Sequence, residues 1–479
     1  MSIERQALSA LKWSALAKLG GQVVTWLVTL VVLRLLSPGD YGLMAISSVI
    51  ISILASVAEL GLGASIVQTR AISRDDLTRI AGALLVLNLG LGLVVVLSAP
   101  LAAAVFNDSR LADVVRVSAI HFLLNAASTV PQSLATRDMK FKWLASIELA
   151  SSLFASASTL ALAWGGAGVW ALVLGSLAGG VLRTCFLLVR GESVWPSLAL
   201  RGIGQHLSFG GALTSGRLLW QVVIQSDILI GGRFLTQEAV GVYSVSLHLA
   251  TLPMQKMMGI VNQVAFPTVA RLQDEMPRLR ARLLDASRLL FFVVIPLLWG
   301  VSAVAPELVG LVLGPKWSGA VFPLRVITLV VPISMLGNVF STAISALGKA
   351  WVELRNTLVT AIVLPSGFLI GVQWGVDGLA LSWMITVPLS YGFNFPRSRR
   401  VLGIRLMEIA GSIHASVLAG ALMYGAVWGA RFLLGWMPDL HRLPALIAVG
   451  AAAYLGAVSL LDRRIWADAR RVVRALRDS

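Results

Sequence analysis

Long apolar runs and short polar connections alternate along almost the whole chain. An α-helix needs about 20 residues to cross the roughly 30 Å hydrocarbon core of a bilayer, and fourteen runs come close to or exceed that length. These runs cover residues 13–36, 42–67, 80–106, 114–136, 144–164, 169–189, 208–232, 241–264, 289–313, 322–347, 357–374, 376–395, 409–433 and 443–461. The pattern predicts an all-α polytopic membrane protein with about fourteen transmembrane helices.

The connections between these runs are short and rich in turn-forming residues. Residues 37–40 (Ser-Pro-Gly-Asp) and 165–168 (Gly-Gly-Ala-Gly) are typical of tight turns. Only residues 266–288 form a longer connection, and the spacing of their charges predicts an amphipathic helix lying on the membrane surface. Residues 13–36 form too long an apolar run for the core of a signal peptide, so we expect them to be the first transmembrane helix.

Composition and charge agree with a membrane protein and exclude a soluble one. Apolar residues make up 57% of the chain and charged residues only 13%, whereas soluble domains are about 25% charged. Apart from Arg183, Arg217 and Lys256 within helices, the Lys and Arg residues of the termini, loops and helix ends divide 28 to 8 between the two sides of the membrane. By the positive-inside rule, this excess places both termini in the cytoplasm. The basic tail, residues 463–479, is then expected to contact anionic lipid and not nucleic acid.

The sequence contains no motif for a cofactor or metal site. Its single cysteine, Cys185, lies in an apolar run, and its five histidines show no metal-binding spacing. It has no Gly-x-x-x-x-Gly-Lys-Ser/Thr loop, so ATP is not expected to drive it directly. We therefore expect neither a metal nor a cofactor.

An internal repeat divides the chain into two lobes. Residues 18–47 align without gaps with residues 217–246, and nine of thirty positions are identical. Among the identities are Gln22/Gln221, Arg34/Arg233, Gly42/Gly241 and Ser47/Ser246. Six helices separate the copies, so both have the same orientation, as in the parallel repeats of transporters.

We accordingly expect three parts, defined by these helices. Residues 1–207 form an N-lobe of helices 1–6, and residues 208–400 form a C-lobe of helices 7–12. Residues 401–479 add helices 13–14 and the basic tail.

Three short motifs resemble those of a known family. They are residues 34–42 (RLLSPGDYG), the stretch 266–274 that begins Phe-Pro and ends Ala-Arg-Leu-Gln-Asp, and residues 313–317 (LGPKW) followed by Pro323-Leu324. In order and spacing the chain resembles the Wzx-type polysaccharide flippases of the MOP exporter superfamily. The resemblance implies translocation of a polyprenyl-pyrophosphate-linked oligosaccharide across the bacterial inner membrane, for O-antigen, capsule or exopolysaccharide assembly. It also implies coupling to an ion gradient and a possible polysaccharide polymerase as partner.

Polar residues recur on the matching helices of the two lobes. Arg217, Gln221 and Gln225 follow one another at i, i+4 and i+8, and so lie on one face of helix 7. Helix 1 repeats the first two as Lys18 and Gln22. Such a stripe suits a water-filled cavity that binds a pyrophosphate and sugar hydroxyls.

Further ionisable residues lie within the apolar runs. A charged side chain within the membrane costs free energy, so each of these residues is expected to have a functional role or a partner. Lys256 lies three residues after Pro253 in helix 8; it is a second candidate for substrate binding, and the alternative is that it reaches the inner membrane interface. Asp227, Glu59 and Glu148 are candidates for binding a coupling ion or for pairing with a cation such as Arg217. Arg183 is expected to reach the membrane interface, since it lies close to the end of helix 6.

Arg34, Gly42, Arg233 and Gly241 surround the turns after helices 1 and 7. The arginines would complement the negative ends of the two helices, and the glycines would serve the turns. A role of these four residues in a periplasmic gate is the alternative.

Two rival functions remain. A cation-coupled multidrug exporter of the same superfamily would favour acids in the cavity, whereas the stripe is basic. An integral membrane polymerase or ligase would need large outer loops, and no predicted outer loop exceeds about a dozen residues. We therefore expect a transporter and not an enzyme.

Overall fold

The computed structural model describes residues 21–58, 61–69, 72–199 and 218–462, and within these ranges the chain is helical with no strand. Ten stretches of these residues are long and apolar enough to cross a membrane. One of them, Ala350–Leu402, contains two separate helices. The all-α membrane fold is thus confirmed, while the expected number of fourteen helices is not confirmed by these stretches.

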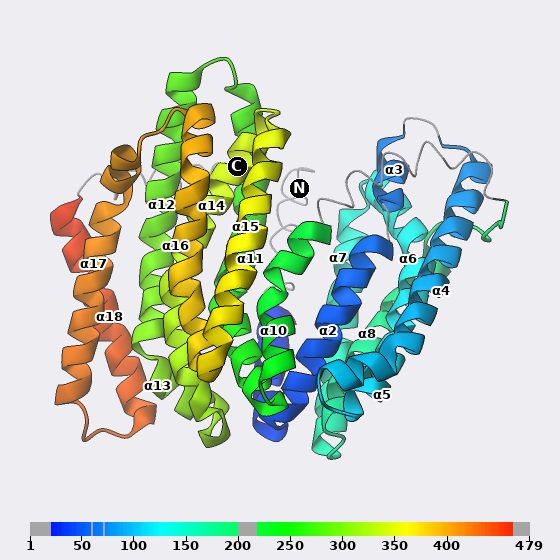
Figure 1. The fold of residues 1–479 in the computed structure, drawn as a ribbon, viewed down its shortest axis with the longest axis horizontal. Coiled ribbons are helices and arrows are strands. Elements are labelled where there is room, and N and C mark those ends of the chain that lie inside the picture. The colour runs from blue at the N-terminus through cyan, green and yellow to red at the C-terminus, as the bar shows by residue number, and fades with distance from the viewer. Residues whose placement is uncertain (1–20, 59–60, 70–71, 200–217, 463–479) are drawn as a thin grey trace, which may run out of the picture. The chain divides into compact units, whose positions relative to one another are not determined.

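The chain divides into two compact units, residues 1–241 and 242–479 (Figure 1). The first unit contains a helix over Gly21–Leu35 and a helical segment over residues 218–224. Its other helices are α2 (Pro38–Ala58), α3 (Leu62–Gln68), α4 (Arg74–Val105), α5 (Arg110–Ser118), α6 (Ile120–Arg137), α7 (Phe141–Trp164), α8 (Val169–Arg190) and α10 (Ser226–Phe234).

The boundary between the units falls inside α11 (Gln237–Arg271). The helices that follow are α12 (Met276–Ala303), α13 (Ala305–Leu308), α14 (Val321–Ala346), α15 (Ala350–Gly371), α16 (Gly375–Leu402), α17 (Leu406–Leu433) and α18 (Asp439–Leu461). A π-helical turn over Val309–Leu313 and a 3-10 helix over Pro315–Ala320 connect α13 to α14.

The internal repeat extends to the turns that precede α7 and α15. Met139 and Gly348 both have a left-handed backbone, with φ of 55° and 70°. The next residue in each turn donates its N–H to a carbonyl five residues back: Lys140 to Ala135 at 2.9 Å, and Lys349 to Ile344 at 3.1 Å. The two units therefore use the same turn at equivalent places, although the sequence comparison had reached only the first helices of each lobe.

Helix pairs pack closely where small residues face each other. In α7 and α8, a Cβ atom added at Gly175 would lie 1.9 Å from the hydroxyl oxygen of Thr159. In α15 and α16, a Cβ added at Gly367 would lie 2.0 Å from a methyl carbon of Thr386. Membrane helices associate through such close backbone approach because lipid supplies no hydrophobic drive between them.

The prediction that residues 266–288 form a long connection with a surface helix is wrong. Instead, α11 continues to Arg271 and α12 begins at Met276, so only a short turn separates them. The charged residues of this stretch extend two membrane helices beyond the apolar region. Periodicity could not distinguish this arrangement from a surface helix, because the helical period is the same in both.

Candidate functional site

The repeat-related turns lie at residues 34–42 and 233–241, and we call them the paired turns. In the first, Ser37 and Asp40 form a capping box for α2: Asp40 N–H donates to Ser37 Oγ at 3.2 Å, and Ser37 N–H donates to Asp40 Oδ2 at 2.9 Å. In the second, Ala239 N–H donates to Thr236 Oγ1 at 3.3 Å. Ser37 and Thr236 are therefore equivalent helix caps, as their alignment indicates.

Gly42 and Gly241 bring the paired turns into direct backbone contact. A Cβ atom on Gly42 would lie 1.9 Å from the carbonyl oxygen of Gln237, and one on Gly241 would lie 1.7 Å from that of Pro38. Pro38 and Gln237 are themselves equivalent in the repeat. The contact is therefore reciprocal, and no side chain fits at either glycine.

This contact corrects the expectation that the two glycines serve the turns. Neither Gly42 nor Gly241 has a positive φ, and both lie inside helices, in α2 and α11. A glycine is required there by the close approach of another backbone and not by an unusual backbone conformation. The sequence signal was present in the alignment, but alignment alone does not show that aligned residues touch.

The two arginines of the paired turns are exposed. Arg34 lies in the last turn of the helix over Gly21–Leu35, and Arg233 lies in the last turn of α10. Both positions agree with the expected interaction with the negative end of a helix. The guanidinium of Arg233 also lies 5.8 Å from the ring centre of Phe234.

An ion pair accompanies the paired turns on the connection between α4 and α5. Asp108 and Arg110 lie 2.8 Å apart. The hydrogen bond from Arg110 holds the pKa of Asp108 below its usual range. The carboxylate therefore remains charged well into acidic solution, and its pairing to Arg110 is lost only when the pH falls below that lowered pKa.

The predicted substrate stripe is described only in part. Lys18 and Arg217 lie outside the described residues, and the side chain of Lys256 is not described either. Gln22 is half-buried, and Gln221 Nε2 donates to Ser52 Oγ of α2 at 3.2 Å.

Gln225 does not continue the helix before it. It lies at a turn between the helical residues 218–224 and α10. The stripe expected on one continuous helix is therefore interrupted at its third member, a break that helical spacing alone did not reveal.

The three candidate acids have different surroundings. Asp227 is fully buried in α10, and its carboxylate accepts the N–H of Ile228 at 2.7 Å. Glu148 is exposed and lies 3.3 Å from Arg183 Nε. Glu59 lies outside the described residues.

Arg183 has polar partners on two neighbouring helices. Besides Glu148 on α7, its guanidinium contacts Gln132 Oε1 on α6, at 2.8 Å. These polar partners stabilise the guanidinium, and its reach to the membrane interface stays a prediction.

The sequence reasoning overlooked Glu307, although this residue lies inside one of the predicted apolar runs. Its side chain is only 1% exposed. Arg431 of α17 binds both carboxylate oxygens at 2.7 Å, and Arg442 of α18 lies 3.4 Å from one of them. A glutamate in an apolar run was the available signal, but its partners are more than 100 residues away in the sequence.

A second overlooked cluster joins α15 to α16. Arg397 donates to Asn356 Oδ1 at 2.9 Å and to Asn394 Oδ1 at 2.7 Å. Asn394 in turn donates to Thr360 Oγ1 at 3.2 Å. These contacts pair buried amides across the two helices, as polar residues within membrane bundles require.

Residues 31–322 match a protein family described as polysaccharide biosynthesis protein. The match covers more than half of the chain and includes both paired turns. The chain belongs to this family.

This polysaccharide biosynthesis protein has similar relatives among well-described proteins. It is 24% identical over 455 residues to the lipopolysaccharide biosynthesis protein WzxC of Escherichia coli K12, covering 93% of this chain and 87% of WzxC. It is 27% identical over 421 residues to the teichuronic acid biosynthesis protein TuaB of Bacillus subtilis 168, covering 83% of this chain and 84% of TuaB.

The fold of this polysaccharide biosynthesis protein resembles that of the lipid II flippase MurJ in an inward closed conformation. The TM-score is 0.72 over 94% of this chain and 99% of MurJ, at 13% sequence identity. The similarity shows a shared all-helical fold.

Proposed function

We propose that this polysaccharide biosynthesis protein is a flippase that moves a polyprenyl-pyrophosphate-linked oligosaccharide across the bacterial inner membrane. Its relatives WzxC and TuaB are named for the biosynthesis of two surface glycans. Its fold is that of a protein that flips a lipid-linked substrate. The product would serve O-antigen, capsule or exopolysaccharide assembly.

The reciprocal contact of Gly42 and Gly241 carries this proposal. A transporter that works by alternating access needs an end that can close and reopen. At Gly42 and Gly241 the two helices touch through their backbones, so this part of the contact can open without breaking a side-chain interaction. We therefore assign the paired turns, with Arg34 and Arg233 beside them, to a gate at the periplasmic end.

The basic stripe supplies the recognition of the substrate. Lys18 and Arg217 are equivalent in the repeat, and Gln22 and Gln221 follow them on the same faces. Two cations match the charge of a pyrophosphate, and the amides of Gln22, Gln221 and Gln225 can hydrogen-bond with sugar hydroxyls. Lys256 is a further cation proposed to contact the pyrophosphate.

Arg217→Ala should abolish most flipping of a lipid-linked oligosaccharide by purified protein in liposomes. Arg217→Lys should retain more activity, because Lys keeps the charge but not the planar fork that binds phosphate at two points. Arg74→Ala is the matched control, since Arg74 is exposed at the first turn of α4. Normal flipping by a folded Arg217→Ala protein would refute the substrate-binding role and favour an ion pair with an acid.

Energy for export is proposed to come from an ion gradient, with Asp227, Glu59 or Glu148 as the coupling carboxylate. Asp227 is the first candidate because it is fully buried and lies on the helix segment next to the stripe. An ion reaches a buried carboxylate only when the surrounding helices separate, which would link ion binding to opening of the gate. Glu148 is a weaker candidate, since its partner Arg183 already neutralises it.

Asp227→Asn should preserve the basal rate of flipping in liposomes but remove its response to an imposed proton or sodium gradient. Asparagine has the same shape and can still accept the N–H of Ile228. Asp113→Asn, an exposed acid paired with Arg116, is the control. A gradient response that survives in Asp227→Asn would direct attention to Glu59 and Glu148.

A cation-coupled multidrug exporter is the alternative function. It predicts that the protein in liposomes accumulates lipophilic cations and ignores lipid-linked glycans. The family description and the names of the relatives favour the glycan. The basic stripe also favours an anionic substrate, because opposite charges attract.

We further propose that both termini lie in the cytoplasm, because the excess of Lys and Arg falls on that side. A polysaccharide polymerase that consumes the exported unit is a proposed partner. Membrane lipids are proposed to surround the apolar helices.

A further inference from the structure

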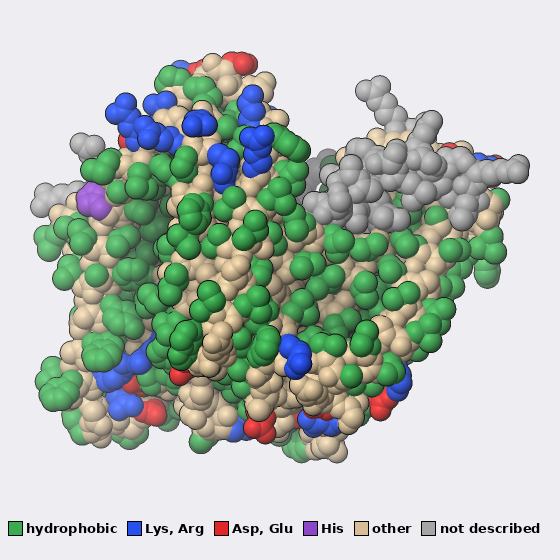
Figure 2. Space-filling model, viewed as in Figure 1, with side chains coloured by type: hydrophobic (Ala, Val, Ile, Leu, Met, Phe, Trp, Pro, Cys, Tyr) green, Lys and Arg blue, Asp and Glu red, His purple; other side chains and the backbone are tan. Residues whose placement is uncertain are grey.

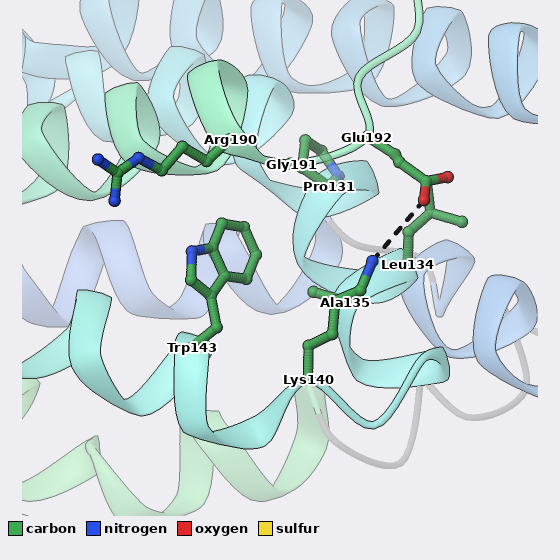
Figure 3. A pocket seen from close by; sticks show the side chains of 8 residues that line it. All are labelled: Pro131, Leu134, Ala135, Lys140, Trp143, Arg190, Gly191 and Glu192. Carbon is green, nitrogen blue, oxygen red and sulfur yellow. Dashed lines mark ion pairs between the residues drawn. The ribbon is translucent and has the colours of Figure 1, made fainter.

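Two cavities lie beside the equivalent turns that precede α7 and α15. The first, of about 340 Å³, lies where α6, α7 and α8 end or begin, and its lining includes Lys140, Trp143, Arg190 and Glu192 (Figure 3). We call it the α7 pocket. The second, of about 370 Å³, lies beside the turn before α15. We call it the α15 pocket.

The lining of the α15 pocket repeats the charges of the first. Lys349 precedes α15 as Lys140 precedes α7, and both follow the same left-handed turn. Arg400 lies in the last turn of α16, and Arg190 ends α8. Asp274 contributes one carboxylate to the second pocket, as Glu192 does to the first.

The lining of each pocket therefore includes two cations and one acid. Arg190 and Arg400 are exposed and make no hydrogen bond or ion pair within the part of the chain that the structure describes. Lys140, in contrast, lies 2.8 Å from Asp138 and 3.7 Å from Glu192. The hydrogen bond that Lys140 donates to Asp138 raises the pKa of Lys140, so this ammonium stays charged.

The α7 pocket has an apolar wall beside its charged groups. Figure 3 shows the guanidinium of Arg190 and the indole of Trp143 on the same side of the pocket, with Lys140 turned toward Glu192. The indole N–H and the guanidinium are both hydrogen-bond donors. Tryptophan is typical of the boundary between lipid tails and headgroups.

Large apolar side chains are exposed next to both pockets. Met139, Phe141 and Val189 flank the α7 pocket along the chain, and Trp351 follows Lys349 by two residues. In the second unit, lysine and arginine side chains gather beyond an apolar flank at one end of the helices (Figure 2). Exposed cations near the start of α12, the start of α15 and the end of α16 are Arg278, Arg282, Lys349, Arg355, Arg399 and Arg400.

A ligand for these pockets must combine a single negative charge with a long apolar part. A phospholipid has both: its phosphodiester carries one negative charge that a guanidinium binds at two points, and its acyl chains cover apolar helix surface. We propose that each pocket binds the phosphate headgroup of one anionic phospholipid, so that the chain holds two such lipids at equivalent sites. This inference does not depend on the transported substrate.

Native mass spectrometry of the purified, delipidated chain tests the proposal, with phosphatidylglycerol added back. We expect two tightly held phosphatidylglycerol molecules on the unaltered protein. Arg190→Gln and Arg400→Gln should each remove one, and the double variant both, with affinity lowered roughly tenfold or more at each site. Arg74→Gln in the first unit and Arg282→Gln in the second are controls, because both arginines are exposed outside the pockets.

Three results would overturn the proposal. The double variant could retain both lipids. The control variants could lose lipid to the same extent, which would mean that general positive charge, and not the pockets, holds the lipid. Inorganic phosphate at millimolar concentration could also displace the lipid, which would identify a site for free phosphate. Because the substituted arginines are exposed, folded protein is expected in every variant, and the elution volume in size-exclusion chromatography checks it.

Discussion

Gly42→Ala is expected to abolish most glycan export while the protein still reaches the membrane. The added methyl carbon would lie 1.9 Å from the carbonyl oxygen of Gln237, a distance that no packing tolerates. Backbone must therefore move apart by more than an ångström. Forcing an extra carbon into a tightly packed contact costs about 1–3 kcal/mol. That cost shifts the equilibrium away from the state with touching turns by roughly 5- to 150-fold.

Export is measured as flipping in liposomes and as surface glycan in cells that depend on the variant. Gly241→Ala should give the same defect, because its methyl carbon would meet Pro38 in the same way. Gly90→Ala is the control, since no atom lies within 4 Å of the added carbon in that membrane helix. If Gly42→Ala and Gly241→Ala both export normally at normal protein levels, the paired turns are not a gate.

Glu307→Ala is expected to cause the largest loss of stability among single substitutions in the second unit. The substitution leaves Arg431 and Arg442 near each other without the carboxylate that holds them. Removing one partner from a buried ion pair costs about 3–5 kcal/mol, because the remaining charge stays desolvated. The contact also joins α13 to α17 and α18, so the last two helices should detach first on heating.

The measurement is the temperature at which half of the detergent-purified protein is lost from the monodisperse peak in size-exclusion chromatography. Glu148→Ala is the matched control: it breaks the pair with Arg183, in which the carboxylate side chain is 70% exposed. Exposed pairs contribute only about 0–1 kcal/mol. Equal losses in the two variants would contradict the view that burial gives the Glu307 cluster its strength.

Several features of this protein follow from its sequence because they depend on neighbouring residues. The apolar runs predict an all-α membrane fold, since only a helix satisfies the backbone of a single segment in lipid. The Ser-Pro-Gly-Asp turn predicts a helix start, and Ser37 and Asp40 form that cap. The alignment of residues 18–47 with 217–246 predicts equivalent turns, which the structure extends to the turns before α7 and α15.

Other features were decided only by the tertiary structure. Gly42 and Gly241 were assigned to turns from sequence, yet they lie in helices and contact the backbone of the opposite turn. No partner of Arg183 was predicted from sequence, yet Gln132 and Glu148 on two other helices contact it. In both cases the deciding partner lies on another helix, and no local property of the sequence identifies it.

The difference has a physical cause. Helix formation, capping and membrane insertion are set by interactions within about four residues, so the sequence by itself determines them. The environment of a charged or small residue depends on which distant helices pack against it. Glu307 and Arg431 are 124 residues apart in the chain and 2.7 Å apart in space. The sequence thus determined the class and the repeat of this protein, whereas helix packing decided where its glycines and charges act.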